Sequence, residues 1–204
     1  MAKLLIIFIS ILFFFNLSFG QSPGDYYLAV SMDSTQGGKL KFLNDTTLEI
    51  SSIPRHMSPS IKTVYKYVST DTTIEILPGV VANKDITPTG IYVQPARKTK
   101  LTLIKIDRGF IDYSTSLIYV RQKDFPDTPD ITYVIDGKSY LQDMGVTDGY
   151  GLIQKSPKTN KALQKRLKTI DMDNCTIEIV RGLAAYERFG IDRVYGVVVI
   201  TTKK

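Results

Sequence analysis

The C-terminal stretch Ile177–Lys204, IEIVRGLAAYERFGIDRVYGVVVITTKK, decides the predicted fold. It opens with a short apolar strand at Ile177–Val180, and a compact helical segment is predicted at Leu183–Phe189. Gly190 follows at the position where helices commonly end on a left-handed residue, which glycine adopts at the least cost. The final strand, Tyr195–Thr202, contains a run of consecutive apolar residues, so we expect it inside a sheet that is covered on both faces.

A segment further upstream belongs to the same pattern. Residues 133–137 read Tyr-Val-Ile-Asp-Gly, which predicts a strand and then a tight turn at Asp136 and Gly137. Together the two segments resemble the C-terminal half of the plug domain of TonB-dependent outer-membrane receptors of the Bacteroidetes type. The family pattern is roughly I-E-V-L-K-D-A-S-A-x-A-x-Y-G-x-x-x-x-x-G-V-I-x-I-T-T-K-K. The C-terminal residues that match it without a gap are Ile177, Glu178, Ala184, Gly190, Gly196, Val197, Ile200, Thr201, Thr202, Lys203 and Lys204.

The resemblance covers about residues 130–204, and the chain departs from the pattern at three places. After Gly190 the family has a small residue and then Arg, whereas here Ile191 and Asp192 come first and Arg193 follows one place late. Phe189 stands where the family has Tyr, and Lys138-Ser139 replaces the common Val-Pro. The resemblance implies a small mixed sheet with helices packed on it. Its structural motif residues would be Asp136, Gly137, Ile177, Glu178, Gly190, Gly196, Thr201 and Thr202.

The first twenty residues, MAKLLIIFISILFFFNLSFG, have the pattern of a secretory signal peptide. Lys3 supplies the positive end, Leu4–Phe15 is the apolar core, and small residues precede the expected cleavage before Gln21. An uncleaved membrane anchor is the alternative, but the apolar run is shorter than the ~20 residues that a span requires. We therefore expect an exported protein without a transmembrane span after signal removal. It would lie in the periplasm or at the periplasmic face of the outer membrane.

Residues 27–121 show the alternation of apolar and polar residues that predicts short strands. Two similar hairpins share the sequence D-T-T-[LI]-E-I, at Asp45–Ile50 and Asp71–Ile76, and Lys and Glu at alternate positions turn one face to water. Further strands are expected at Leu101–Ile106 and Leu117–Val120. We predict an all-β module over residues 21–123, an antiparallel meander that forms a packed sandwich or a small open barrel.

The whole chain is predicted to be α+β. A connector rich in Pro and Asp, Asp124–Pro129, separates the β meander from a small mixed α/β plug-like domain over residues 124–204. The β module could enclose a ligand cavity, as small barrels can. A packed module without a cavity is the favoured alternative, and the sequence leaves both open.

A helix is predicted at Asn160–Thr169, with Ala162, Leu163 and Leu167 on its inward face. Basic residues crowd this region and form either a solvated helix face or a docking patch for an acidic partner. They are Lys158, Lys161, Lys165, Arg166 and Lys168.

The sequence offers few residues for catalysis, metal binding or disulfides. His56 is the one histidine and Cys175 the one cysteine, so an internal disulfide is impossible and a Ser-His or Cys-His pair would need His56. Asp171–Asn174 begins like a calcium loop but lacks the glycine and the distal glutamate of such a loop. The formal charge of +6 falls by one when Lys3 leaves with the signal, an excess too small to indicate nucleic-acid binding. We predict no catalytic site, no metal and no cofactor.

The plug resemblance implies a protein that is not a transporter by itself. In the family the plug sits inside a large barrel, which in the largest class has ~22 strands. At ~10 residues each, these strands would need ~220 residues, and the chain ends where that barrel normally begins. The leading hypothesis is therefore an exported, non-enzymatic, plug-like protein that binds an envelope protein, such as an outer-membrane transport component. The alternative is a periplasmic small-molecule binding protein that uses the β module, and a hydrolase based on His56 is the third option.

Overall fold

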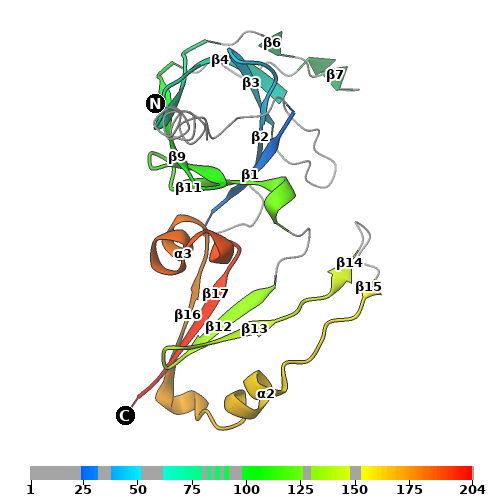
Figure 1. The fold of residues 1–204 in the computed structure, drawn as a ribbon, viewed down its shortest axis with the longest axis vertical. Helices are drawn as coiled ribbons and strands as arrows, with labels where there is room; N and C mark the ends of the chain where they lie inside the picture. Colours follow the sequence, from blue (N-terminus) through cyan, green and yellow to red (C-terminus); the bar gives the residue numbers. More distant parts are fainter. Residues whose placement is uncertain are drawn as a thin grey trace, which may run out of the picture.

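The computed structural model describes residues 24–31, 38–51, 62–79, 98–125, 130–147 and 153–203, and the backbone of three two-residue strands between 82 and 91. The expected signal peptide, His56 and most of the predicted connector lie outside these residues. Two main sheets lie end to end, with the N-terminal strands in one and the C-terminal strands in the other (Figure 1).

The N-terminal part consists of short strands and one 3-10 helix. These elements are β1 (Tyr26–Val30), β2 (Gly38–Phe42), β3 (Thr47–Ser51), β4 (Lys62–Ser69), β5 (Thr73–Ile76), β6 (Ala82–Asn83), β7 (Ile86–Thr87), β8 (Gly90–Ile91), β9 (Leu101–Ile106), β10 (Gly109–Asp112), β11 (Leu117–Arg121) and η1 (Gln122–Asp124).

The C-terminal part combines strands with short helices. Its elements are β12 (Ile131–Ile135), β13 (Lys138–Gln142), β14 (Val146–Thr147), β15 (Ile153–Lys155), α2 (Lys161–Leu167), η2 (Met172–Asn174), β16 (Cys175–Val180), α3 (Gly182–Phe189), η3 (Ile191–Arg193) and β17 (Val197–Thr202).

Eight N-terminal strands form a closed antiparallel barrel. Their order is β3-β2-β1-β11-β10-β9-β5-β4, and the pairing of β3 with β4 closes the ring. The two predicted hairpins are confirmed, since β2 pairs with β3 and β4 pairs with β5. The two copies of the repeated D-T-T motif lead into β3 and β5, the second strand of each hairpin.

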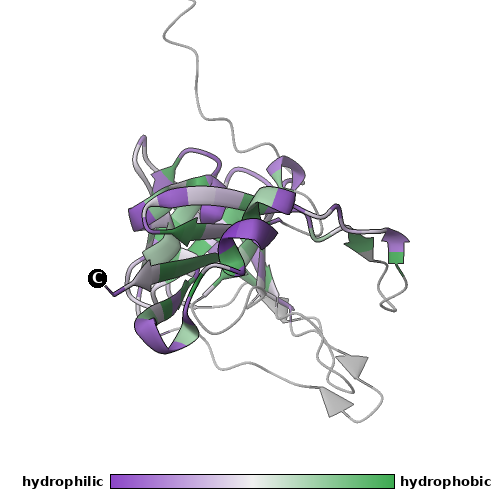
Figure 2. Ribbon diagram, turned by 90° about the horizontal axis from the view of Figure 1, so that it is seen from below, coloured by the Kyte–Doolittle hydropathy of each residue, from purple (hydrophilic) through white to green (hydrophobic). Residues whose placement is uncertain are grey.

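Alternate residues of the barrel strands point inward and pack against one another. Hydrophobic and hydrophilic residues accordingly alternate along the strands (Figure 2). Aromatic rings meet in the interior, with ring centroids 4.8 Å apart for Tyr27 and Phe110 and 5.2 Å apart for Phe42 and Tyr67. The inward cluster comprises Tyr27, Ala29, Leu40, Phe42, Leu48, Tyr65, Tyr67, Ile74, Ile76, Leu101, Leu103, Phe110 and Tyr119. The described inward side chains therefore pack against one another in the barrel interior.

The second main sheet has the order β13-β12-β17-β16. β17 runs parallel to β12 and antiparallel to β16, so the predicted C-terminal strand does lie inside a sheet. On one face of the sheet, Ile135 and Ile200 pack with Leu163 of α2 and with Ile170. Val197 and Ile200 are buried, whereas the intervening Val198 and Val199 are half-buried.

The α3–η3 segment joins the two parts, because it leaves the second sheet and packs on the outside of the barrel (Figure 1). Leu183, Ile191 and Val194 form one buried cluster with barrel residues that point outward. Those barrel residues are Val30, Ile111, Ile118 and Val120. Burial on both faces explains why every residue of β10 is buried.

The two parts also approach each other closely at Gly182. Its φ of +58° lies in the left-handed region, and a Cβ atom there would stand 2.9 Å from the carbonyl carbon of Ser31. Glycine therefore satisfies two conditions at this position, the backbone conformation and the space beside the barrel. The Gly182 N–H donates to the carbonyl oxygen of Val194 at 2.8 Å, which holds the start of α3 against the end of η3.

The predicted fold class, α+β, is wrong. The described chain is mostly β, with a closed barrel in place of a packed sandwich or a small open barrel, and with a second small sheet in place of an α/β plug-like domain. The helices are short: α2 has 7 residues and α3 has 8. The sequence pattern revealed individual strands, but barrel closure depends on pairings such as β1 with β11, whose partners are far apart in the chain. The predicted boundary at residue 124 falls between β11 and β12, although the cluster around Leu183 spans both sides of it.

Candidate functional site

The turn at Asp136 and Gly137 is an anchor for the C-terminal strand. One Asp136 carboxylate oxygen accepts hydrogen bonds from the Thr202 N–H at 2.9 Å and the Thr202 hydroxyl at 3.1 Å. The other accepts from the Arg166 guanidinium at 2.5 Å. The Thr202 backbone hydrogen bond, with help from Arg166, lowers the pKa of Asp136 below its ordinary value. Two residues predicted from the motif, Asp136 and Thr202, are therefore brought together, and their contact is structural.

The other motif residues support the β16–α3–β17 unit. The Glu178 carboxylate lies 2.7 Å from the Arg188 guanidinium of α3. Gly190 ends α3 with a φ of +83°, as predicted, and its N–H donates to the Tyr186 carbonyl oxygen at 2.8 Å. Of the remaining motif residues, Ile177 lies in β16 and Thr201 in β17, and Gly196 directly precedes β17. Gly137 lies in the turn between β12 and β13.

The predicted basic patch lies on and beside α2, but its members differ in their surroundings. The helix is shorter than predicted, since Asn160 caps it through a hydrogen bond from the Leu163 N–H at 3.0 Å. Only Leu163 is buried within it, so the prediction that Ala162 and Leu167 face inward is wrong. The reason is that a 7-residue helix presents a single residue to the sheet.

Arg166 does not belong to a free cationic surface, because it is paired with Asp136. The pKa of Asp143 is lowered mainly by a hydrogen bond from the Gly145 N–H, then by the charge of Lys155, and to a smaller extent by Lys158. Lys158 therefore lies near an acidic side chain of its own chain. Lys161, Lys165 and Lys168 are exposed, and no ion pair with a described residue involves them. The patch predicted from the sequence is therefore reduced to these three lysines.

Strand β16 forms an open edge of the second sheet. It pairs with β17 on one side, and no described strand lies on the other. The side chains of Ile177 and Ile179 are 50% and 56% exposed. The residues that pair with them lie in β17, an interior strand of the sheet. Cys175 is half-buried at the start of the same strand, and its Sγ donates to the Met172 carbonyl oxygen at 3.5 Å. This edge was not singled out from the sequence, although the alternating apolar residues of Cys175–Val180 could have suggested it.

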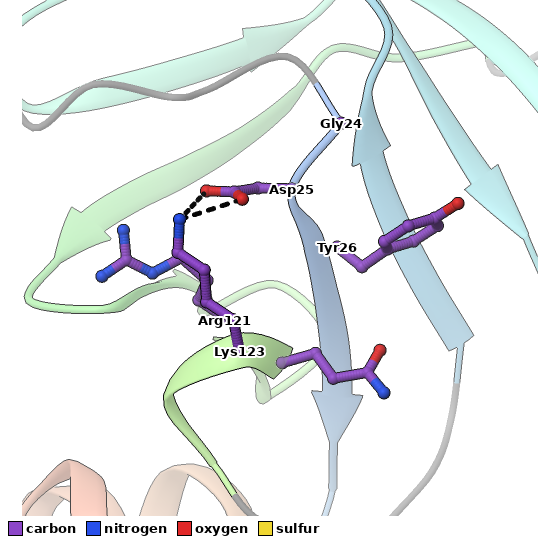
Figure 3. A pocket seen from close by; sticks show the side chains of 6 residues that line it. Gly24, Asp25, Tyr26, Arg121 and Lys123 are labelled. Atoms are coloured by element: carbon purple, nitrogen blue, oxygen red, sulfur yellow. Dashed lines mark hydrogen bonds and ion pairs between the residues drawn. The ribbon is translucent and has the colours of Figure 1, made fainter.

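A pocket of about 310 Å³ opens beside the start of β1 and the end of β11 (Figure 3). It is lined by Gly24, Asp25, Tyr26, Arg121, Gln122 and Lys123. Lys123 Nζ lies 3.0 Å from both carboxylate oxygens of Asp25, and Arg121 Nε donates to Asp124 at 2.5 Å. A charged ligand would have to break these ion pairs, so the pocket is a weak candidate for a binding site.

The acidic turn before β16 uses its own oxygens. The Asp171 carboxylate accepts hydrogen bonds from the Asp173 N–H at 3.1 Å and from the Asn174 side chain at 2.7 Å. Within the described residues, no group of three or more His, Cys, Asp and Glu side chains could hold a metal ion. His56, on which the hydrolase hypothesis depends, lies outside the described residues.

The contact between α3–η3 and the barrel was not predicted from the sequence. Asp192 lies 2.9 Å from the guanidinium of Arg108, which also stands over the ring of Phe125 at 5.5 Å. The ring of Phe125 meets that of Tyr195 edge-on at 5.6 Å. The signal that could have revealed this contact is the departure from the family pattern at Ile191 and Asp192.

Comparisons of the chain with family models, with curated proteins and with solved structures gave no match. The resemblance to receptor plugs thus remains a prediction from the motif residues. The described segments of the chain contain no helix that is both long and apolar enough to cross a membrane.

Proposed function

We propose that the protein is an exported, non-enzymatic adaptor that binds an acidic segment of an envelope protein at the periplasmic side of the outer membrane. The observation that carries the proposal is the cationic face of α2, formed by Lys161, Lys165 and Lys168. The export pattern and the plug resemblance supply the compartment, and the charge of this face supplies the kind of partner.

The placement of the three lysines follows from helix geometry. Residues at positions i, i+4 and i+7 share one face of a helix, and Leu163 lies on the opposite face. Because Leu163 packs into the second sheet, Lys161, Lys165 and Lys168 are directed to solvent. Arg166 lies nearer the buried side, which explains why it reaches Asp136.

The lysine face places two like charges, Lys161 and Lys165, one helical turn apart. Like charges at i and i+4 destabilise a helix by about 0.2–0.5 kcal/mol per pair. Asp171 and Asp173 follow the helix, yet no ion pair joins them to these lysines among the described residues. A carboxylate-rich partner would relieve this repulsion.

The experiment is a pull-down from an outer-membrane extract with two charge-matched variants. One carries Lys161→Glu, Lys165→Glu and Lys168→Glu, and the control carries Lys39→Glu, Lys66→Glu and Lys98→Glu on or beside the barrel. We expect an envelope protein that is captured by the wild type and the control, lost with the α2 variant, and released as salt increases. Capture that is equal for the two variants would contradict the proposal.

The alternative is a small-molecule binding protein, and among the described residues the pocket beside Lys123 is a place where a ligand could be tested. A thermal-shift screen of envelope metabolites tests it. A metabolite that raises Tm in the wild type and not in Lys123→Ala would favour this alternative.

A further inference from the structure

We propose that the open edge of β16 pairs with β16 of a second copy, so that two four-stranded sheets join into one continuous antiparallel sheet. This inference uses a different surface from the α2 face and does not rest on the proposed function. An open strand edge carries a row of unpaired backbone donors and acceptors and is a template for pairing with another chain.

The hydrogen-bond pattern identifies the residues that point outward from the edge. The Lys203 N–H donates to the Asn174 carbonyl oxygen at 2.8 Å, so this pair is a hydrogen-bonded pair of the β16–β17 ladder. Such pairs alternate along antiparallel strands. Thr176, Glu178 and Val180 therefore bond to β17, and the N–H and C=O groups of Cys175, Ile177 and Ile179 point to the open side. The described structure gives these three residues no backbone partner there.

The sequence of the edge is self-complementary about Ile177. If Ile177 lies opposite Ile177 of the second copy, Cys175 lies opposite Ile179, and all three outward-pointing residues form hydrogen-bonded pairs. Antiparallel pairing of identical strands generates a two-fold axis, the commonest symmetry of homo-oligomers. The half-exposed side chains of Ile177 and Ile179 then cover each other across the axis on one face.

Charge complementarity favours this register over its neighbours. Glu178 lies opposite Thr176 of the second copy, and the end of β16 with Arg181 comes towards η2, which contains Asp173, of the second copy. Arg181 is half-buried and Asp173 is exposed. A shift that centres the pair on Glu178 would place two carboxylates directly opposite each other, which is destabilising.

The size of the contact sets the strength of the dimer. Pairing of two six-residue strands buries less than the roughly 1,200–2,000 Å² of a standard stable interface. We therefore expect a dimer whose population depends on protein concentration. Sedimentation velocity over a concentration series measures it directly.

Ile177→Lys places like charges at the two-fold axis and should raise the dimer Kd by about 10-fold or more. The matched control is Val68→Lys on the barrel, since Val68 is also 50% exposed and also lies in a strand. Far-UV circular dichroism checks that both variants are folded. A protein that is monomeric throughout the series, or an Ile177→Lys variant that dimerises as tightly as the control, would overturn the proposal.

Cross-linking tests the register. In a Cys175→Ser background, Thr176→Cys and Glu178→Cys are made as two separate variants of different mass. In the proposed register residue 176 faces residue 178 of the other copy, so disulfides should form when the variants are mixed and not when either is alone. Disulfides in the Glu178→Cys variant alone would reject this register. The α2 variant of the pull-down should still dimerise, so failure of one proposal is distinguishable from failure of the other.

Discussion

Replacing Leu183 with alanine measures how strongly α3 binds the second sheet to the barrel. Leu183 is 9% exposed and belongs to the cluster that includes Val30 and Ile118 of the barrel. The substitution removes the equivalent of about three CH₂ groups, or about 2.4 kcal/mol at about 0.8 kcal/mol each. The cavity left between the two parts adds to this loss, so we expect destabilisation of about 3 kcal/mol, within the roughly 2–5 kcal/mol known for buried Leu→Ala changes.

Urea unfolding monitored by far-UV circular dichroism and by tyrosine fluorescence provides the assay, since the chain has 12 tyrosines and no tryptophan. The matched control is Leu167→Ala, the same substitution in the other short helix. Leu167 is 37% exposed, so this change should cost less than about 1 kcal/mol. Because the cluster joins the two parts, both probes should report one transition that moves to lower urea in Leu183→Ala.

Two results would refute this reasoning. The first is a Leu183→Ala variant no less stable than Leu167→Ala, which would mean that α3 rests on the barrel without stabilising it. The second is a wild-type protein whose barrel and second sheet unfold in separate transitions, only one of which responds to the substitution. Either result would show that the shared cluster does not couple the two parts.

Three further predictions concern single positions. Gly182→Ala should lower Tm, because the added Cβ would meet the Ser31 backbone and a left-handed non-glycine residue costs about 1–2 kcal/mol by itself. Asp136→Asn should reduce the loss of stability that the wild type shows at acid pH. The pKa of Asp136 is lowered in the folded state, so its carboxylate stabilises the fold above the unfolded pKa of about 4. This stabilisation is lost as the pH falls through the folded pKa. Tyr27→Phe should reduce the fall in Tm that the wild type shows at alkaline pH. Burial raises the pKa of Tyr27 to about 12 in the folded state, so the wild type loses stability as the pH rises from the unfolded pKa of about 10 towards that value. A wild-type and variant profile that coincide would contradict either of the last two predictions.

The local elements could be predicted from the sequence because their signals are local. The alternation of apolar and polar residues predicted the strands of both hairpins, and the run of apolar residues near the C-terminus predicted that β17 is an interior strand. Gly190 marked the end of α3 through its positive φ. Closure of the barrel has no such signal, because β3 and β4 are also plausible as neighbours in an open meander. The pairing of β1 with β11 depends on residues about ninety positions apart, which no local pattern encodes.

The candidate site was predicted in part. Five basic residues looked equivalent in the sequence, yet Arg166 faces Asp136 and Lys158 lies beside Asp143. Helix geometry separates Arg166 from the three lysines once Leu163 is known to be the buried residue. The partner of Arg166, however, comes from a turn thirty positions earlier, so the pair emerges only from the folded sheet.

The residues that depart from the plug-like motif predicted from the sequence have a clear structural role in this chain. Matching residues such as Asp136 and Thr202 bond to each other within the second sheet. The two residues placed ahead of Arg193 instead contact the barrel: Ile191 is buried in the shared cluster, and Asp192 pairs with Arg108. A sheet that packs on the outside of a barrel from its own chain needs an apolar side chain and a counter-charge at this loop. Ile191 and Asp192, which follow Gly190, therefore help to attach the C-terminal sheet to the N-terminal barrel.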